Sequence, residues 1–527
     1  MVTASELPIE TVREGVTAVD LAEAIFGAGV TVTGASYNGD VDSAGIYSGG
    51  DTVGQGTTPG DTGIILSTGN AEDFTNDSGD ANQSTRTSTN TTGEDNRADF
   101  NAFAGTRTFD AAFLDVDFIP QGNVLTMEFV FSSEEYPEFI NSIFQDFVGV
   151  WINGAEVPLA VGNGDIDPGN VNSEDSQNLF IDNADGGLNT EMDGLTITLS
   201  LTIPVVSDEV NSIRIAIADV SDNRYDSSLL IGGDSAQTEL VAIEDEASLF
   251  PDGVKEIDVL GNDVTTSSGV LTITQLNGID VVAGDTITLK TGQDVTLNDD
   301  GTLTLTGDGS EEDFNFTYTV DDGTLSDTGI VNVSSIPCFV AGTMIATPEG
   351  TKSVETLKPG DLVLTHDDGP QPLRWIGRRT MRAEGAYAPI EVREGTFGKH
   401  QTLIVSPQHR IMLRDPAAEI LFGDAEVLVA AKYLVNGHAV RRRVGGFVTY
   451  VHLMFDRHQV IYSEGLATES FLPGPQFKDV FEEETLNEIC AIFPELDPRT
   501  GTGYSQAARR TLRRHEANLW REKTQAA

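Results

Sequence analysis

The sequence predicts a mainly β protein built from several domains in series. Between residues 111 and 335 it repeats short apolar or alternating segments bounded by turn residues, a pattern typical of β-sandwiches. Helical periodicity is confined to a short stretch after residue 16 and to the end of the chain. Composition changes abruptly at Cys338, and 527 residues are enough for each part to bury its own core.

The first domain is expected over residues 15–235, as a β-sandwich. It opens with a short helix leading into a strand across residues 16–34, and five strand-like segments follow between residues 111 and 232. The intervening stretch is rich in Gly, Ser, Thr, Asn and Asp, a composition that packs no core. Residues 70–98 are therefore expected to be poorly ordered.

Two polar patches, Ser133 to Glu138 and Asp219 to Ser227, interrupt these strands. Together with the earlier segments GASYNGD and GIILSTG, they resemble the choice-of-anchor L domain of bacterial surface and secreted proteins. The resemblance covers roughly residues 15–235. It implies a cellular address, extracellular or at the cell surface, more than a chemistry.

A second β unit is expected over residues 240–335. The segment Ile257 to Val264 opens it, GVLTITQLNGIDV and DGTLTLTGDG supply hairpin-like repeats, and FNFTYTVDDGTLSDTGIVNVS closes it. These segments resemble the Ig-like, cadherin-like repeats of bacterial adhesins, present here as one copy. A single copy is expected to form a small β-sandwich that acts as a spacer.

Charge is distributed very unevenly along the chain. Residues 1–337 contain 8 Lys and Arg against 59 Asp and Glu, a net charge of −51, whereas residues 338–527 contain 23 against 24, a net charge of −1. An acidic, lysine-poor front argues against nucleic acid and anionic membranes as partners, since both require a cationic surface. No apolar run approaches the ~18 residues that a membrane span needs.

Carboxylates in the two polar patches are candidate ligands for a metal ion. Ca²⁺ takes about six to eight oxygen ligands and prefers carboxylates, and no other cofactor is expected. The alternative is that these acidic residues only form turns. The candidate ligands are Glu134, Glu135, Asp219, Asp222 and Asp226.

One of only two cysteines stands at the change in composition, and two histidine-containing motifs follow it. A thiol needs a nearby base to become a thiolate, and Cys and His residues far apart in sequence commonly converge in space. In order, CFVAGT from Cys338, Ser-x-x-His from Ser406, and H-x-x-x-D-x-H from His452 resemble the Hint family, the module shared by Hedgehog C-terminal domains and inteins. The resemblance covers about residues 336–474 and implies an all-β fold.

The resemblance also implies that this domain cleaves its own chain. The Cys338 thiol would attack the carbonyl carbon of Pro337 and convert the peptide bond into a thioester. That shift is uphill unless the site strains the bond and protonates the departing nitrogen. His409 takes the family's role of protonating that nitrogen. Ser406 replaces the usual threonine and keeps a hydroxyl that can hydrogen-bond the scissile peptide.

Completion of the reaction needs a second nucleophile. No Asn-Cys, Asn-Ser or Asn-Thr boundary follows the late motif, so the thioester is expected to pass to an unknown acceptor: water, an amine or an alcohol. Asp456 and His458 are candidates to activate that acceptor, and His452 occupies the place of the family's late acid. Residues 475–527 predict a helical tail.

Two functions remain open. In the first, a secreted or surface protein releases its acidic β-domains through Cys-dependent self-cleavage, which is not a turnover activity. In the second, the protein is a non-catalytic adhesin-like or matrix protein with a structural Hint fold; Pro337 favours this reading, since a prolyl carbonyl is a hindered acyl donor. Cell-surface or matrix components would be partners in either case. Residues 1–15 show no Sec signal pattern, so export without a visible signal peptide is expected.

Overall fold

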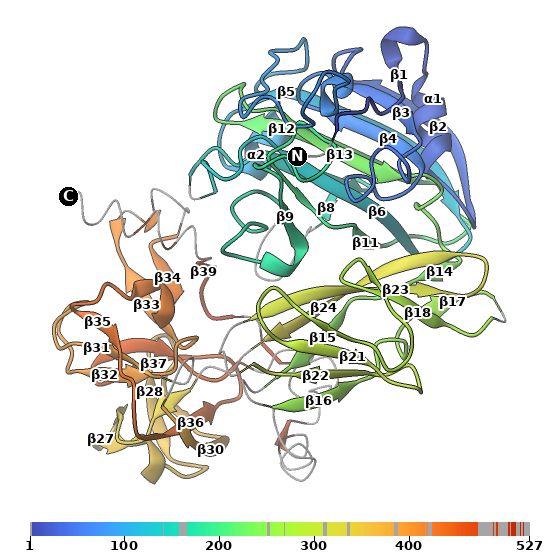
Figure 1. Ribbon diagram of the computed structural model, residues 1–527. Helices are drawn as coiled ribbons and strands as arrows, with labels where there is room; N and C mark the ends of the chain where they lie inside the picture. The colour runs from blue at the N-terminus through green and yellow to red at the C-terminus, as the bar shows by residue number, and fades with distance from the viewer. Residues whose placement is uncertain are drawn as a thin grey trace.

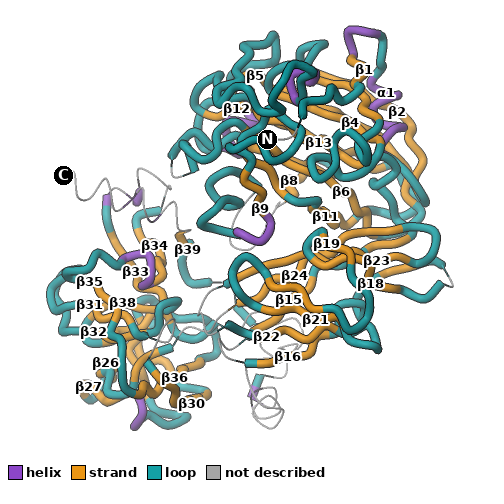
Figure 2. Tube along the Cα trace, viewed as in Figure 1, coloured by secondary structure: helices purple, strands orange, loops and turns teal. Residues whose placement is uncertain are grey.

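The computed structural model consists of three successive β units, and each sheet contains strands of one unit only (Figure 1). It describes residues 3–472 apart from 141, 158–165, 250–252, 268, 309–312, 335–337, 384–387, 417 and 420–423, together with scattered residues between 489 and 520. Strands and loops make up most of this part, in agreement with the predicted fold class (Figure 2). None of its helices is long and apolar enough to cross a membrane.

The first unit is a sandwich of two antiparallel sheets. One sheet contains β1 (Ile9–Thr11), β3 (Ala44–Ser48), β4 (Thr62–Ser67), β6 (Val124–Ser133), β9 (Phe180–Asp182), β10 (Gly194–Thr196), β11 (Leu199–Pro204) and β13 (Ser227–Gly232). Their order is β1-β3-β4-β13-β6-β10-β9, and β11 also pairs with β6. The facing sheet contains, in spatial order, β2 (Val30–Asn38), β5 (Thr108–Pro120), β12 (Asn211–Val220), β7 (Phe147–Ile152) and β8 (Ala155–Val157).

Alternating apolar residues of the two sheets meet between them. Leu114 and Val116 on β5 and Phe129 and Phe131 on β6 are buried in the same cluster. Because side chains on a strand point alternately to its two faces, every second residue enters this core. Its large aromatic and branched side chains account for the strand-like pattern of the sequence.

A short helix closes one side of this core. It is α1 (Ala18–Ile25), and its buried face is formed by Leu21, Ala22 and Ile25. Thr17 begins the helix through a capping box, since the Asp20 N–H donates to the Thr17 hydroxyl and the Thr17 N–H donates to the Asp20 carboxylate. The predicted helix followed by a strand is therefore present.

The polar stretch 70–98 differs from its expectation, because the structure describes all of it. It contains η2 (Ala71–Phe74) and leads into α2 (Ala98–Ala104). Backbone amides tie it to buried carboxylates: the Thr89 N–H donates to Asp226 at 2.8 Å, and the Thr91 N–H donates to Asp110 at 2.9 Å. The composition could not show this, since the acceptors lie far away in sequence.

The second unit contains two main sheets and a small ribbon. The first main sheet is β15 (Asp245–Ser248), β24 (Ser326–Ser334), β23 (Phe314–Asp321), β18 (Thr272–Leu276) and β19 (Ile279–Asp280), in spatial order. The second is β16 (Val254–Ile257), β22 (Leu303–Thr306), β21 (Asp294–Leu297) and β20 (Thr286–Thr288). The ribbon pairs β14 (Leu240–Val241) with β17 (Val264–Thr265).

Polar side chains join the first unit to the second. Asp327 on β24 is 1% exposed and accepts hydrogen bonds from the Thr126 hydroxyl at 3.0 Å and the Ala242 N–H at 2.7 Å. Burial, together with the nearby charge of Glu128, holds the pKa of Asp327 well above its usual range. The junction is thus a specific contact between β6 and β24 and not only a flexible linker.

The third unit is built from two sheets around one apolar core. The first sheet is, in spatial order, β30 (Trp375–Arg382), β36 (Phe447–Met454), β25 (Phe339–Val340), β32 (Leu403–Val405), β31 (Ile390–Val392) and β35 (Val440–Arg442). The second is β27 (Gly350–Ser353), β26 (Met344–Thr347), β37 (Val460–Ser463), β38 (Leu466–Glu469), β33 (Arg410–Arg414), β34 (Glu426–Ala430) and β39 (Thr511–Leu512), with β28 (Leu362–Thr365) and β29 (Gly369–Pro372) on a branch.

Most of the predicted helical tail, 475–527, lies outside the described residues. Among those that are described, the Phe493 N–H donates to the Ile489 carbonyl at 2.8 Å, and both side chains pack against Trp375. Leu512 belongs to β39, which pairs in parallel with β34. The tail therefore contributes a strand to the third unit.

Replacing Tyr318 by Phe tests the polar anchoring of the second unit. The buried Tyr318 hydroxyl lies 3.0 Å from the Val259 carbonyl and 2.9 Å from Asp263 Oδ1. Its loss removes these buried hydrogen bonds, although Asp263 Oδ1 keeps the one from the Ile243 N–H, so the unit should lose about 1–2 kcal/mol in its free energy of unfolding. Scanning calorimetry of the whole chain measures this. Tyr225→Phe, at a partly exposed site, is the control; equal behaviour of the two variants would contradict the role of the Tyr318 hydroxyl.

Candidate functional site

Cys338 enters the third unit at the centre of its first sheet. The following residue, Phe339, pairs with Val405 of β32 on one side and with Val451 of β36 on the other. The Cys338 side chain is 7% exposed and packs near Tyr450. The preceding residue, Pro337, lies outside the described residues, so the predicted cleavage site is described only on its C-terminal side.

Ser406 holds the backbone of Cys338 from both sides. The Cys338 N–H donates to the Ser406 hydroxyl at 2.8 Å, and the Ser406 N–H donates to the Cys338 carbonyl at 2.9 Å. Ser406 is fully buried, directly after β32. The Ser406 hydroxyl, which was expected to contact the scissile peptide, therefore accepts a hydrogen bond from the nitrogen of that peptide.

The imidazole of His452 lies beside the thiol of Cys338. Its Nε2 is 3.4 Å from Sγ, within the range of a hydrogen bond that involves sulfur. His452 is 7% exposed on β36, the strand next to β25, and its ring contacts Phe471 edge to face. A base at this distance can take the thiol proton.

His409 is buried against the residue that follows the cysteine. Its ring centroid lies 4.3 Å from that of Phe339, and it is 1% exposed. Neither ring nitrogen has a hydrogen-bond partner. Burial, more than the opposing charge of Glu469, lowers the pKa of His409 to about 4, so the ring is neutral at pH 7. The Cys338 N–H is bound by Ser406 and not by His409.

His458 and Asp456 are directed elsewhere. The His458 Nδ1 accepts the Ala508 N–H at 2.9 Å, and its Nε2 lies 3.2 Å from the Ser470 carbonyl. Asp456 follows the end of β36, is exposed, and pairs with Arg374 at 3.2 Å. The structure thus brings Ser406 and His452 to Cys338. His409 contacts the next residue, Phe339, and not Cys338. His458 and Asp456 make other contacts.

Glu469 is a buried charge to which the sequence analysis gave no role. It is 0% exposed, accepts the Arg410 N–H at 2.8 Å, and lies 3.2 Å from the Arg410 guanidinium and 3.5 Å from His458 Nε2. Burial opposes its ionisation, but Arg410 and His458 outweigh burial and lower its pKa to about 2. The only signal available in the sequence was an acid in the short segment Glu469-Ser470-Phe471, which follows the late histidine motif.

The predicted metal ligands all lie at one end of the first unit. Glu134, Glu135, Asp219 and Asp226 are at most 2% exposed, whereas Asp222 is half-buried. Burial raises the pKa of Glu134 to about 9 and that of Asp226 to about 7. No three His, Cys, Asp or Glu side chains in the described part of the chain are grouped to hold a metal ion by themselves.

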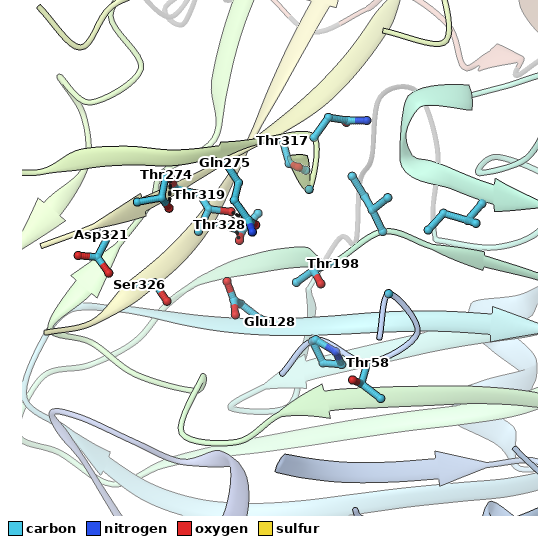
Figure 3. Close-up of a pocket in the computed structure, with 16 residues that line it drawn as sticks. Thr58, Glu128, Thr198, Thr274, Gln275, Thr317, Thr319, Asp321, Ser326 and Thr328 are labelled. Atoms are coloured by element: carbon cyan, nitrogen blue, oxygen red, sulfur yellow. Dashed lines mark hydrogen bonds between the residues drawn. The ribbon is translucent and has the colours of Figure 1, made fainter. Parts of the chain in front are cut away.

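A polar cavity of about 600 Å³ lies between the first two units (Figure 3). Glu128 and Thr198 line it from the first unit, and Gln275, Thr319 and Asp321 line it from the second. Burial raises the pKa of Glu128 to about 7. The cavity contains none of the predicted site residues.

Replacing Glu469 by Ala should strongly destabilise the third unit. It leaves Arg410 and His458 without their buried partner, which typically costs about 3–5 kcal/mol. The control, Asp456→Ala, removes the exposed pair with Arg374, and its cost should stay within about 1 kcal/mol. Urea unfolding followed by tryptophan fluorescence measures both, and equal effects would contradict the role assigned to Glu469.

The first unit should become less stable as the pH rises. Burial raises the pKa of Glu134 to about 9 and of Asp146 to about 8, so the folded state retains protons that the unfolded chain has already released. The free energy of unfolding must therefore fall between the ordinary carboxyl range and pH 9. Melting temperatures in chelator should decline from pH 5 to pH 9, whereas a steady rise would show that these groups are ionised when folded.

Family models match three successive parts of the chain. A choice-of-anchor L domain matches residues 10–237, a bacterial Ig domain residues 236–334, and a Hint domain residues 337–475. No curated protein matches the chain.

Three solved structures illustrate what the chain is similar to. The gp41-1 intein is 13% identical, and the match covers 25% of this chain and 98% of that one with a TM-score of 0.17. The MchDnaB-1 intein is 16% identical with the same coverages and a TM-score of 0.18. The Msm DnaB1 intein splicing domain, crystallised with zinc, is 19% identical with the same coverages and a TM-score of 0.17.

The recognised families agree with the sequence resemblances in kind and in order. The anchor-type domain indicates a surface or extracellular protein, and the Hint domain belongs to a self-processing family. The chain therefore contains a choice-of-anchor L domain, a bacterial Ig domain and a Hint domain, in that order.

Proposed function

We propose that the Hint domain cleaves its own chain between Pro337 and Cys338 and thereby releases the two acidic domains outside the cell or at its surface. The observation that carries this proposal is the pair of contacts around Cys338. Its thiol lies 3.4 Å from His452 Nε2, while its amide N–H is bound by the Ser406 hydroxyl at 2.8 Å. An N-to-S acyl shift requires a nucleophile that has a base beside it. It also requires a polar group at the peptide nitrogen.

In the first step His452 takes the proton of the Cys338 thiol. The thiolate attacks the carbonyl carbon of residue 337, and a carbon–sulfur bond forms as the carbon–nitrogen bond breaks. The departing nitrogen must gain the proton that His452 has taken, while its own N–H donates to the Ser406 hydroxyl. The products are a thioester on Cys338 Sγ and a free α-amino group on the same residue.

In this mechanism His409, which lies against the Phe339 ring, stabilises the reacting peptide. It is neutral, buried and without a hydrogen-bond partner, so its nitrogens are available to the reacting peptide once that peptide distorts. A water, amine or alcohol then attacks the thioester, and the Cys338 thiol leaves. We assign no part in this step to Asp456, since it is exposed and paired with Arg374.

The alternative is a Hint domain that serves only as a scaffold in an adhesin-like or matrix protein. One observation favours it: the histidine of the Ser-x-x-His motif makes no hydrogen bond to the Cys338 amide, which is instead satisfied by Ser406. A peptide N–H that is already hydrogen-bonded in the ground state gives the peptide less reason to react. The two functions differ in whether a thioester ever forms.

Intact mass of the purified chain with and without dithiothreitol tests the proposal. Thiol should release a front fragment ending at Pro337 and a back fragment beginning at Cys338, and Cys338→Ala should abolish both. His452→Ala should slow thiol-induced release by about 10²–10⁴-fold, since it removes the base. His438→Ala, at an exposed position, should have no effect.

Two results would overturn self-cleavage in favour of the scaffold. One is wild-type protein that stays whole in thiol while Cys338 is freely alkylated. The other is a pair of fragments that persists in Cys338→Ala, because an ordinary protease would then explain them. Circular dichroism of each variant establishes that it is folded.

A further inference from the structure

A row of buried acids crosses the second sheet of the first domain, at one end of its three central strands β5, β12 and β7. On β12, Ile213, Ile215 and Ile217 point into the core between the two sheets, and Asp219 continues this alternation. Ala218 pairs with Phe147 of β7, which places Asp219 beside Asp146. On the other side the pairing with β5 contains a bulge, and Asp110 lies within it, opposite the end of β12.

Asp219 has no hydrogen-bond donor of its own. It is 1% exposed, and neither carboxylate oxygen accepts a hydrogen bond of ordinary geometry. Burial, together with the nearby charge of Asp146, holds the pKa of Asp219 well above its usual range, and the nearby Thr68 hydroxyl offsets this only in part. Asp110 is also 1% exposed; one oxygen accepts from Thr91, and its Oδ2 has no partner. Both oxygens of Asp219 and one oxygen of Asp110 are thus buried without a hydrogen-bond partner, as is Oδ2 of the neighbouring Asp226. Leaving buried carboxylate oxygens unsatisfied is unfavourable.

Side chains of Lys and Arg do not compensate these acids. In the described part of the chain no ion pair involves Asp110, Asp146, Asp219 or Asp226. Asp146 is satisfied by the Val220 N–H and the Ser227 hydroxyl, so it does not need a further partner. Asp219 and Asp110 do need one, because buried charges are stable only when they are paired, neutralised or bound to a metal ion.

A shared proton would leave a recognisable geometry. One carboxyl would donate to the other, and their oxygens would lie about 2.5–2.7 Å apart. In the described structure no hydrogen bond joins Asp219 to Asp110, or to its other acidic neighbours Asp146 and Asp226. Two carboxylates with unsatisfied oxygens instead carry the charge that balances one divalent cation.

We propose that a divalent cation, with Ca²⁺ as the best match, binds between the two sheets of the first domain on the carboxylates of Asp219 and Asp110. No three acidic, His or Cys side chains of the described residues are grouped to form a metal cage, so the other ligands are neutral oxygens. The Thr68 hydroxyl and water fill that role, since Ca²⁺ accepts neutral oxygens besides carboxylates.

The proposed ion would stabilise the loop that covers this end of the sandwich. Asp110 accepts the Thr91 N–H through its other oxygen, and Asp226, a neighbour of Asp219, accepts the Thr89 N–H. An ion on Asp219 and Asp110 would hold these acceptors in place and so link the loop to both sheets. Of the set predicted from the sequence, this proposal keeps Asp219 as a ligand and leaves out Glu134, Glu135, Asp222 and Asp226, and it adds Asp110.

Calorimetric titration of the full chain with CaCl₂ at pH 7.5, after removal of metals by chelator, tests the site. Wild type should bind Ca²⁺ saturably, and the melting transition of the first domain should rise by about 5 °C at saturation. Asp219→Asn should abolish both effects. Its metal-free melting temperature should equal or exceed that of wild type, because an uncompensated buried charge has been removed.

Asp117→Asn is the matched control. This acid is exposed on β5, the strand that carries Asp110, so its loss should leave binding and the Ca²⁺-induced shift unchanged. Asp110→Asn keeps the acceptor for Thr91 and should weaken binding without loosening the loop. If wild type shows no heat and no shift at millimolar Ca²⁺ or Mn²⁺, or if Asp219→Asn keeps the full shift, the proposal is overturned and protons neutralise these acids.

Discussion

The pairing of Phe339 with its two neighbouring strands determines what the Cys338 thiol can reach. A strand of two residues has little stability of its own, so β25 depends on β32 and β36, which flank it. These strands also carry the chemistry: Ser406 follows β32 and His452 lies on β36. The register that places Phe339 between Val405 and Val451 therefore also places a hydroxyl on the Cys338 nitrogen and an imidazole beside its sulfur.

The same register explains which site residues the sequence could predict. His452 lies within β36, so its position follows from strand pairing. Asp456 and His458 belong to the same motif but come after Met454, where β36 ends, and a motif does not reveal whether a side chain beyond a strand turns outward. Glu469 escaped assignment for another reason: a buried acid is recognisable only with its partner, and Arg410 is 59 residues away.

The net charge of the front domains predicts which partners their buried acids lack, but composition does not predict which of their segments are ordered. With only 8 Lys and Arg against 59 acids before Cys338, a carboxylate buried there rarely finds a cationic side chain. Backbone amides take that place in part: Thr89 and Thr91 hold the stretch 70–98 on Asp226 and Asp110, although its composition indicates disorder. An acidic, polar sequence thus acquires order from hydrogen bonds between distant segments, which no local pattern reveals.

At the Cys338 boundary the chain can be divided without breaking backbone hydrogen bonds between the described strands. The last strand before it, β24, ends at Ser334, β25 begins at Phe339, and none of the described sheets contains strands from both sides. Breaking the peptide bond would therefore disrupt no β-ladder.

Charges still attract across the boundary. Burial alone would lower the pKa of Lys432, but Tyr433 of its own domain and Asp313 and Asp175 of the front raise it. Breaking the peptide bond would therefore not by itself separate the two parts, and their separation would also depend on electrostatic contacts, which salt screens where they are solvated.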